Sequence, residues 1–397
     1  MTSLSDVFTS LQPAWRYIET IVQKNSRRVV DAFRQSGLST QDLQGTTGYG
    51  YGDRGRDILD RIVAEIFGCP AGLLRAQWVS GTHALTTTLR AFGPQTQRIW
   101  LANGRVYDTL AGVIAQLSRE WGWEIIALPT QSDGRPAWDR VREKPNPGDI
   151  VYIQRSRGYE PRPAWGPQDI RPVIEWAHQG GAYAVVDNCY GEFTQPEEPG
   201  HWGADLVVGS LMKNAGGAIA PTGAYVAGQE ALVEKVADQL IAPGIGREVG
   251  ATHPYQRLLA QGLFLAPLLV GEALMGGLYL SAKAEALGIP VDPPVSQWDR
   301  NDIVVSLELG RPERIVRFCQ AIQAWSPVDA HVTPEPWAMP GYPNAVIMAA
   351  GGFVAGASLE LSADAPMREP YRVYVQGGIN RWHTLLAVDQ AFQAALD

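Results

Sequence analysis

A lysine and an aspartate carry the clearest chemical signal in the chain. Lys213 lies between Ser210 and a pair of glycines, and Asp187 directly follows the apolar run 182–186. An aldehyde cofactor needs a lysine amine for its Schiff base, and it needs a carboxylate to keep its pyridinium nitrogen protonated, so that the ring withdraws electrons. Lys213 and Asp187 offer these two groups. They point to pyridoxal 5'-phosphate (PLP) as the cofactor.

The phosphate of such a cofactor needs a binding loop of its own. Gly81 and Thr82 precede a predicted helix over residues 84–90. Backbone N–H groups at a helix N-terminus bind anions, and Ser210 can add a hydroxyl from the opposite side. Each feature alone has an ordinary explanation, because an aspartate after a strand often caps a turn and a loop lysine is usually solvated. Their combination in one chain favours a PLP site.

Several stretches resemble the fold-type I PLP enzymes, and within them the cysteine and methionine metabolism group. The closer similarity is to the methionine gamma-lyase-like family, whose members are also called aluminium resistance proteins. This resemblance implies the fold, the cofactor and a carbon–sulfur lyase activity on a sulfur amino acid. The stretches that carry it are residues 48–57, 80–84, 106–110, 153–159, 213–217 and 242–246.

The same resemblance implies roles for three further residues. Tyr107 resembles the family's aromatic residue that stacks on the cofactor ring, and its phenol can also donate a proton; otherwise it is a core tyrosine. Tyr51 and Arg54 resemble a pair that reaches the cofactor phosphate from the adjacent subunit. If they do so, the protein is a homo-oligomer, a dimer or a tetramer, with shared active sites. The alternative is that residues 48–56 form a flexible surface loop.

An amino-acid substrate also needs a partner for its carboxylate. A guanidinium binds a carboxylate through two parallel hydrogen bonds, which a lysine cannot do. Arg368 is the first candidate, and Arg155 and Arg157 are the second. His83 either faces the cofactor ring or packs beside the loop that holds the phosphate.

Composition restricts the class of protein. The net charge of −8 and the lack of a long Lys/Arg run exclude nucleic acid as the main partner. Three separated cysteines, without metal-ligand spacing to histidines, suit a reducing compartment, and the N-terminus lacks the pattern of a signal peptide. We therefore expect a cytoplasmic enzyme that uses no metal. The apolar run 262–280 contains Glu272, so we expect a buried interdomain or subunit-contact helix and no membrane span.

The order of apolar patterns predicts an α/β fold. Helical periodicity alternates with short β-rich runs, which indicates a mostly parallel sheet covered by helices. We therefore predict an N-terminal helix and arm (1–50), a large PLP-binding domain (51–288) and a smaller α+β C-terminal domain (289–397). The predicted helices are residues 11–33, 57–67, 107–121, 168–179, 230–240 and 382–396, and the predicted strands are 98–101, 124–128, 150–154, 182–186, 205–208, 303–309 and 371–375.

The predicted chemistry starts with proton removal from the substrate Cα by the Lys213 amine, while the ring paired with Asp187 takes up the charge. A thiol or thioether is then expelled from Cβ or, after a second proton loss, from Cγ. The products are a 2-oxo acid, ammonia and a thiol. Two alternatives remain open at this point: a PLP-dependent aminotransferase, and a non-catalytic protein that binds PLP or confers metal tolerance.

Overall fold

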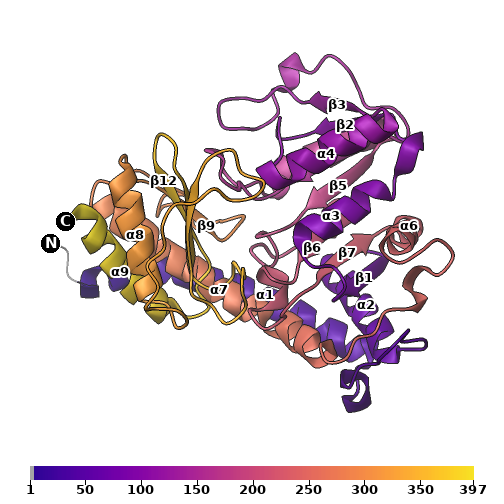
Figure 1. Ribbon diagram of the computed structural model, residues 1–397, viewed down its shortest axis with the longest axis horizontal. Helices are drawn as coiled ribbons and strands as arrows, with labels where there is room; N and C mark the ends of the chain where they lie inside the picture. The colour runs from indigo at the N-terminus through magenta and orange to yellow at the C-terminus, as the bar shows by residue number, and fades with distance from the viewer. Residues whose placement is uncertain (1–3) are drawn as a thin grey trace.

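The computed structural model describes residues 4–397 and shows two lobes of unequal size (Figure 1). Two long helices, α1 (Leu4–Ser36) and α7 (Gln256–Ala286), pack side by side and run from one lobe to the other. The predicted helix over residues 11–33 is therefore longer at both ends. The start of α1 and the C-terminus both lie at the smaller lobe (Figure 1).

A seven-stranded sheet forms the centre of the larger lobe. Its order is β1-β7-β6-β5-β4-β2-β3. The last strand of this sheet in chain order, β7, is antiparallel to both of its neighbours, and the other pairs are parallel. This confirms the prediction of a mostly parallel sheet. The strands are β1 (Ala71–Arg75), β2 (Arg98–Leu101), β3 (Glu124–Ala127), β4 (Ile150–Gln154), β5 (Tyr183–Asp187), β6 (Leu206–Ser210) and β7 (Ala224–Gly228).

Helices cover both faces of this sheet, which explains why its central strands are apolar on both sides. On β5, Val186 belongs to the core shared with α1 and α7, and Val185 belongs to a second core on the other face. The predicted helix 107–121 begins one residue later, because Tyr107 is its N-cap. The helices are α2 (Arg54–Phe67), α3 (Gly81–Arg90), α4 (Asp108–Trp121), α5 (Pro167–Gln179) and α6 (Glu230–Leu240).

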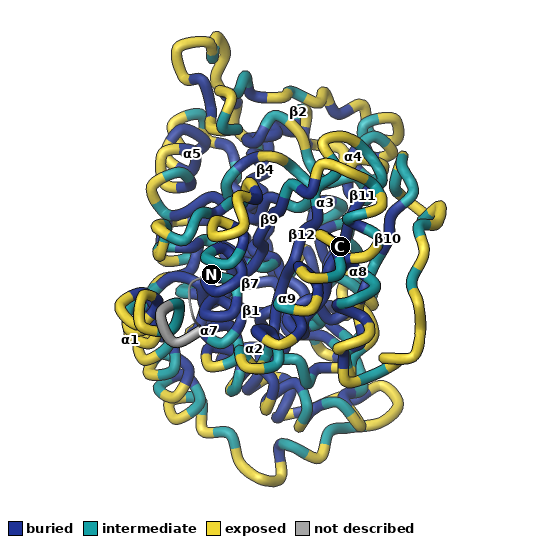
Figure 2. Tube along the Cα trace, turned by 90° about the vertical axis from the view of Figure 1, so that its left-hand side faces the viewer, coloured by how far each residue is buried: buried dark blue, intermediate teal, exposed yellow. Residues whose placement is uncertain are grey.

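The smaller lobe contains a five-stranded antiparallel sheet in the order β10-β11-β12-β9-β8. This sheet packs against α7 and against α8 (Pro312–Ala324). The central strands of both lobes are buried, and the exposed residues lie mainly in loops, on outer helix faces and on the edge strand β3 (Figure 2). The elements are β8 (Val291–Asp292), β9 (Val304–Glu308), α8 (Pro312–Ala324), β10 (Val346–Ala350), β11 (Ser362–Pro366), β12 (Arg372–Gln376) and α9 (Arg381–Leu396).

Short 3-10 helices complete the described chain. One of them directly follows Lys213 and turns the chain away from β6. They are η1 (Thr40–Leu43), η2 (Gly93–Gln95), η3 (Trp138–Arg140), η4 (Pro199–Trp202), η5 (Asn214–Gly216) and η6 (Gly246–Glu248).

Helix α7 has the burial of a core helix. Within the described residues it is the one helix long and apolar enough to cross a membrane, yet 61% of its most apolar 18-residue window is buried inside the molecule. Its glycines allow close backbone approach: a Cβ on Gly271 would lie 2.3 Å from Val22 of α1, and one on Gly262 would lie 2.2 Å from the carbonyl oxygen of Gly216. The second contact places α7 against the loop that carries Lys213.

Candidate active site

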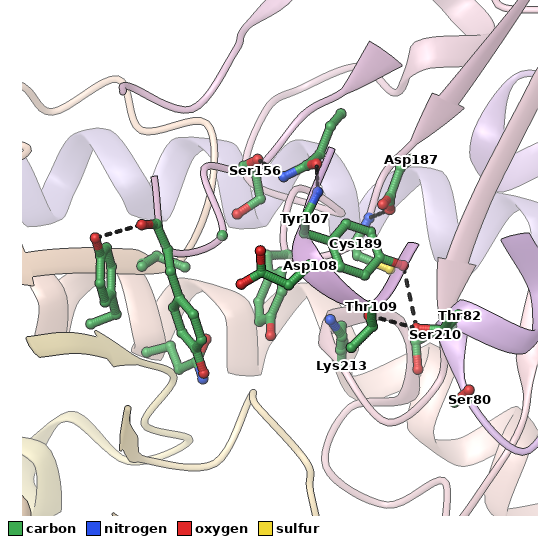
Figure 3. Close-up of a pocket in the computed structure, with 18 of the residues that line it drawn as sticks. Ser80, Thr82, Tyr107, Asp108, Thr109, Ser156, Asp187, Cys189, Ser210 and Lys213 are labelled. Atoms are coloured by element: carbon green, nitrogen blue, oxygen red, sulfur yellow. Dashed lines mark hydrogen bonds between the residues drawn. The ribbon is translucent and has the colours of Figure 1, made fainter. Parts of the chain in front are cut away.

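A cavity of about 270 Å³ lies where the two lobes meet, and Figure 3 shows most of its lining side chains. It brings together six of the residues predicted from the sequence, although they come from four separate parts of the chain. The large lobe provides all six. They are Gly81, Thr82, Tyr107, Asp187, Ser210 and Lys213.

Lys213 follows β6, and its side chain lines the cavity. The amine lies over the ring of Tyr190, 3.7 Å from its centroid. Burial alone would lower the pKa of the amine, but Tyr190, Cys189 and Asp187 outweigh that effect and raise it. Because the ring and the nearby carboxylate favour the charged form, the free amine is held as an ammonium group at a fixed place.

The loop of Lys213 is joined to the loop that follows Asp187. Asn214 donates through Nδ2 to the carbonyl oxygens of Tyr190 (2.9 Å) and Glu192 (3.0 Å). Tyr190 has a left-handed backbone conformation, with φ of +68°, which is uncommon for a residue with a side chain. The amide of Asn214 therefore holds a strained turn in place, directly beneath the lysine amine.

Asp187 ends β5 and is 3% exposed. Its Oδ2 accepts from the hydroxyl of Tyr152 (2.9 Å), and its Oδ1 accepts from the backbone N–H of Cys189 (3.1 Å). Burial raises the pKa of this carboxyl, whereas Lys213 and the hydrogen bonds act in the opposite direction. The donors fix the orientation of the carboxylate, and a cationic partner in the cavity would stabilise its charged form.

The start of α3 forms the expected anion site. The side chain of Ser80 caps the helix by accepting from the N–H of His83 (3.1 Å). The N–H groups of Gly81 and Thr82 have no acceptor within the described chain. A Cβ on Gly81 would lie 3.1 Å from the Cβ of Ser210 and 3.3 Å from the sulfur of Cys189, so glycine keeps this end of the cavity open.

Tyr107 lies between the anion site and Asp187 (Figure 3). Its backbone N–H donates to Oε1 of Gln154 (3.0 Å), and its hydroxyl forms a hydrogen bond with the hydroxyl of Thr82 (3.3 Å). Burial raises the pKa of the phenol, and the charge of Asp187 raises it further. The phenol therefore keeps its proton near neutral pH and can act as a proton donor.

The residues in this cavity fit PLP. A helix N-terminus with free N–H groups suits the phosphate, a buried carboxylate suits the pyridinium nitrogen, and a lysine amine suits the aldehyde. Tyr107 supplies the aromatic ring that the resemblance implies.

Two predicted residues lie outside the cavity in the same chain. Tyr51 is 66% exposed and stacks on the exposed ring of Tyr49. Arg54 is the first residue of α2, and its guanidinium lies 2.6 Å from the carboxylate of Asp42. Their predicted reach to the phosphate of a neighbouring subunit stays a prediction.

Arg155 and Arg157, the second-choice substrate ligands, do not line the cavity. Arg155 is completely buried and donates to Asn188 Oδ1 (2.7 Å) and Thr194 Oγ1 (3.1 Å), with the carboxylate of Glu198 beside it. Arg157 forms an ion pair with Asp292. Because both guanidinium groups are engaged inside the protein, the structure disfavours the substrate-binding role that the sequence suggested for them.

Arg368 and His83 also lie behind the cavity wall. Arg368 is half-buried, and its Nη2 donates to the carbonyl oxygen of Tyr159, a lining residue (3.4 Å). Nδ1 of His83 accepts from the backbone N–H of Val79 (3.3 Å), so this ring packs beside the loop that holds the phosphate site. Arg368 remains the first candidate for the substrate carboxylate.

The other wall of the cavity was missed by the sequence analysis. It comes from the end of β4 and the loop after it, from the loop after β5 and from the small lobe, and tyrosine is its main residue type. A period of two on β12 places two of its members on one face, a pattern that could have revealed them. These lining residues are Gln154, Tyr159, Tyr190, Tyr342, Tyr374 and Gln376.

A mostly parallel sheet with an aspartate at the end of one strand, a lysine after the neighbouring strand and a smaller antiparallel domain defines the fold-type I class of PLP enzymes. The chain belongs to the family described as methionine gamma-lyase, which it matches over residues 2–396. This confirms the resemblance on which the sequence analysis relied.

Similar proteins span nearly the whole chain. A solved structure from Listeria monocytogenes, proposed to be a cystathionine beta-lyase involved in aluminium resistance, is 39% identical, with a TM-score of 0.95 and 98% of each chain covered. A carbon–sulfur lyase involved in aluminium resistance from Clostridium novyi is 37% identical, with a TM-score of 0.91 and coverage of 98% of this chain and 94% of that one. The uncharacterised YnbB of Bacillus subtilis is 40% identical over 393 residues, which are 96% of this chain and 93% of YnbB.

Proposed function

We propose that the protein is a PLP-dependent carbon–sulfur lyase that acts on a sulfur amino acid. One observation carries this proposal: the Lys213 amine, the Asp187 carboxylate and the free N–H groups of Gly81 and Thr82 line a single cavity. Membership of a lyase family, and the lyase names of similar structures, support the reaction class.

Bound PLP would supply an electron sink that stabilises negative charge at the substrate Cα. The N–H groups of Gly81 and Thr82, with the hydroxyl of Ser210, would hold its phosphate. Asp187 would hold the proton on its ring nitrogen, because Tyr152 and the N–H of Cys189 already orient that carboxylate.

Two side chains of the cavity would move protons. The Lys213 amine would take the Cα proton of the substrate, and Tyr190 beneath it would hold the resulting ammonium group. Tyr107 keeps its proton near neutral pH and would pass it to the sulfur as the carbon–sulfur bond breaks. Hydrolysis of the remaining fragment gives a 2-oxo acid and ammonia.

The substrate carboxylate and the subunit arrangement complete the proposal. Arg368 would bind the α-carboxylate, since its guanidinium makes one hydrogen bond, to Tyr159, and no ion pair with a described residue. Tyr51 and Arg54 would reach the phosphate of a neighbouring subunit, which makes the active enzyme a dimer or a tetramer.

An assay of products tests this function. The purified protein with PLP would be incubated with L-methionine, L-homocysteine, L-cystathionine or L-cysteine, with Lys213→Ala as the control. Release of thiol and 2-oxo acid in equal amounts by the wild type alone supports the lyase. Turnover that requires an added 2-oxo acid and releases no thiol would instead identify an aminotransferase, and cofactor binding without any product would identify a non-catalytic protein.

A further inference from the structure

The cavity wall opposite the anion site is formed by a group of tyrosines from both lobes. Tyr159 follows β4, Tyr342 precedes β10, and Tyr374 lies on β12; we call these three residues the tyrosine wall. The ring centroids of Tyr159 and Tyr374 are 5.2 Å apart, and those of Tyr159 and Tyr342 are 5.7 Å apart. A substrate bound to the cofactor would have to lie against this wall, because the anion site, Tyr107 and Asp187 are taken by the cofactor.

The tyrosine wall offers mainly ring surface to a ligand. The hydroxyl of Tyr159 donates to Oδ2 of Asp364 (3.1 Å), and the hydroxyl of Tyr374 donates to the carbonyl oxygen of Tyr159 (2.8 Å). The amide of Gln376 also donates to Oδ2 of Asp364 (2.8 Å). These donors are engaged within the protein, whereas the hydroxyl of Tyr342 has no hydrogen-bond partner among the described residues. What remains for a ligand is therefore mainly ring surface with one free hydroxyl, and a carboxyl group behind it.

The charges around the wall disfavour a second carboxylate on the substrate. Four guanidinium groups lie near enough to Tyr374 for their charges to act against the rise in the pKa of its phenol. Three of these four groups form ion pairs within the protein. The fourth is Arg368, which the proposed function assigns to the α-carboxylate. The three pairs are Arg372 with Glu308, Arg157 with Asp292 and Arg105 with Glu160.

Acidic groups around the wall also disfavour a second carboxylate on the substrate. Asp108 lines the cavity, and its carboxylate makes no hydrogen bond or ion pair with a described residue. Asp364 lies behind the wall, and burial raises its pKa to about 6, so it is ionised at pH 8. Among the described lining residues the one cationic side chain is Lys213, which the cofactor would engage.

We propose that the tyrosine wall is the binding subsite for the sulfur substituent of the substrate, and that it takes an apolar or cationic substituent without a carboxylate. This inference rests on the proposed lyase function. The substrate class is then a monocarboxylic S-substituted amino acid. A dicarboxylic substrate would place its distal carboxylate near Asp108 and Asp364 without a free counter-charge.

The reaction on such a substrate balances without a further reagent. For an S-substituted cysteine, the Cβ–S bond breaks with its electron pair on sulfur, and sulfur gains a proton as Cα loses one. One water molecule then replaces nitrogen at Cα. The products are the free thiol, pyruvate and ammonium.

Three probes of similar length separate the possibilities: S-ethyl-L-cysteine is neutral, S-(2-aminoethyl)-L-cysteine is cationic and S-carboxymethyl-L-cysteine is anionic. At pH 8 we expect the kcat/KM of the neutral and cationic probes to exceed that of the anionic probe by about tenfold or more, as for one uncompensated charge. An anionic probe that is processed as well as the other two would overturn the subsite. The matching homocysteine derivatives repeat the comparison for γ-elimination.

Asp364→Asn tests the charge without a change of shape. We expect the ratio of kcat/KM for the cationic probe to kcat/KM for the anionic probe to shrink severalfold in this variant. Tyr342→Ala should lower kcat/KM for the neutral probe, and Tyr342→Phe, which keeps the ring, should not. An unchanged charge preference in Asp364→Asn would contradict the role of this carboxyl.

Calorimetry measures the binding of the three probes to PLP-loaded Lys213→Ala, which cannot turn them over. This measurement separates a failure of the subsite from a failure of the proposed lyase function. The same order of affinities is expected there: neutral and cationic probes tighter than the anionic one. If no probe of either chain length releases a thiol, the proposed function fails, but these affinities still decide the subsite. Equal affinities for the three probes would overturn it.

Discussion

Glu192→Gln is the perturbation with the clearest physical consequence outside the cavity. Glu192 is completely buried, its Oε1 accepts from the hydroxyl of Tyr225 (3.2 Å), and its Oε2 has no partner within the described chain. It lies against β6, since a Cβ on Gly209 would be 2.4 Å from Oε1. Burial raises its pKa from 4.5 to about 8, and the nearby Glu198 adds to this rise.

The sign and size of the effect follow from that pKa. The folded state binds the proton of Glu192 more tightly than the unfolded state does. This contribution to stability is therefore complete below pH 4.5 and is lost as the pH rises through 8. A difference of about 3.5 pKa units corresponds to about 5 kcal/mol at most, of which the relaxation of the protein will remove a part. Gln keeps the shape and carries no charge at any pH.

Urea unfolding between pH 5 and pH 9 measures this effect. At pH 5 the two proteins should differ by less than about 1 kcal/mol, because Glu192 is protonated and resembles Gln. At pH 9 the variant should be the more stable protein by several kcal/mol. Glu197→Gln, which changes an exposed carboxylate, is the matched control and should follow the wild type. Parallel stability curves for wild type and Glu192→Gln would refute the reasoning.

Three further predictions concern the site. Gly81→Ala should weaken PLP binding about tenfold or more, because the added Cβ meets Ser210 and Cys189. Gly112→Ala is the control and should not weaken it, because its added Cβ meets nothing within 4 Å. A titration of the apoenzyme with PLP measures both variants. Arg155→Met should destabilise the protein by about 3 kcal/mol in urea unfolding and leave relative KM values unchanged, since it removes a partner of a buried carboxylate; a selective rise in KM would favour substrate binding. Tyr190→Leu, which removes both the ring and the hydroxyl, should lower the pKa of Lys213 more than Tyr190→Phe, which removes the hydroxyl alone; the pH dependence of the reaction of Lys213 with PLP measures both.

The sequence predicted the fold well where local patterns determine it. Strands such as β2 and β4 are short apolar runs buried on both faces, so their pattern is visible without tertiary knowledge. β1 was missed because its Gly72 is needed for close contact with the backbone of α2, where a Cβ would lie 2.3 Å from the carbonyl oxygen of Asp60. β11 was missed because it carries Asp364 and ends in a proline.

The site, like the fold, was predictable where local motifs determine it. Lys213, Asp187 and Gly81 belong to local motifs at strand ends and at a helix start, and the structure places them in one cavity. The tyrosine wall depends on how the two lobes pack, and the local pattern of β12 indicates only that Tyr374 shares a strand face with Gln376. Ion pairs also cannot be recognised from a sequence, which is why Arg155 was named as a second candidate for the substrate carboxylate although Glu198 lies beside it in the core.

The most direct test of the account is whether Lys213 carries the cofactor. Purified protein would be supplied with PLP, reduced with borohydride and digested, and the mass of the peptide that contains Lys213 would be measured beside the absorption spectra of the wild type and Lys213→Ala. The account predicts one modified lysine, at position 213, and a visible absorption band that the variant lacks. An unmodified Lys213, or an identical band in the variant, would contradict it.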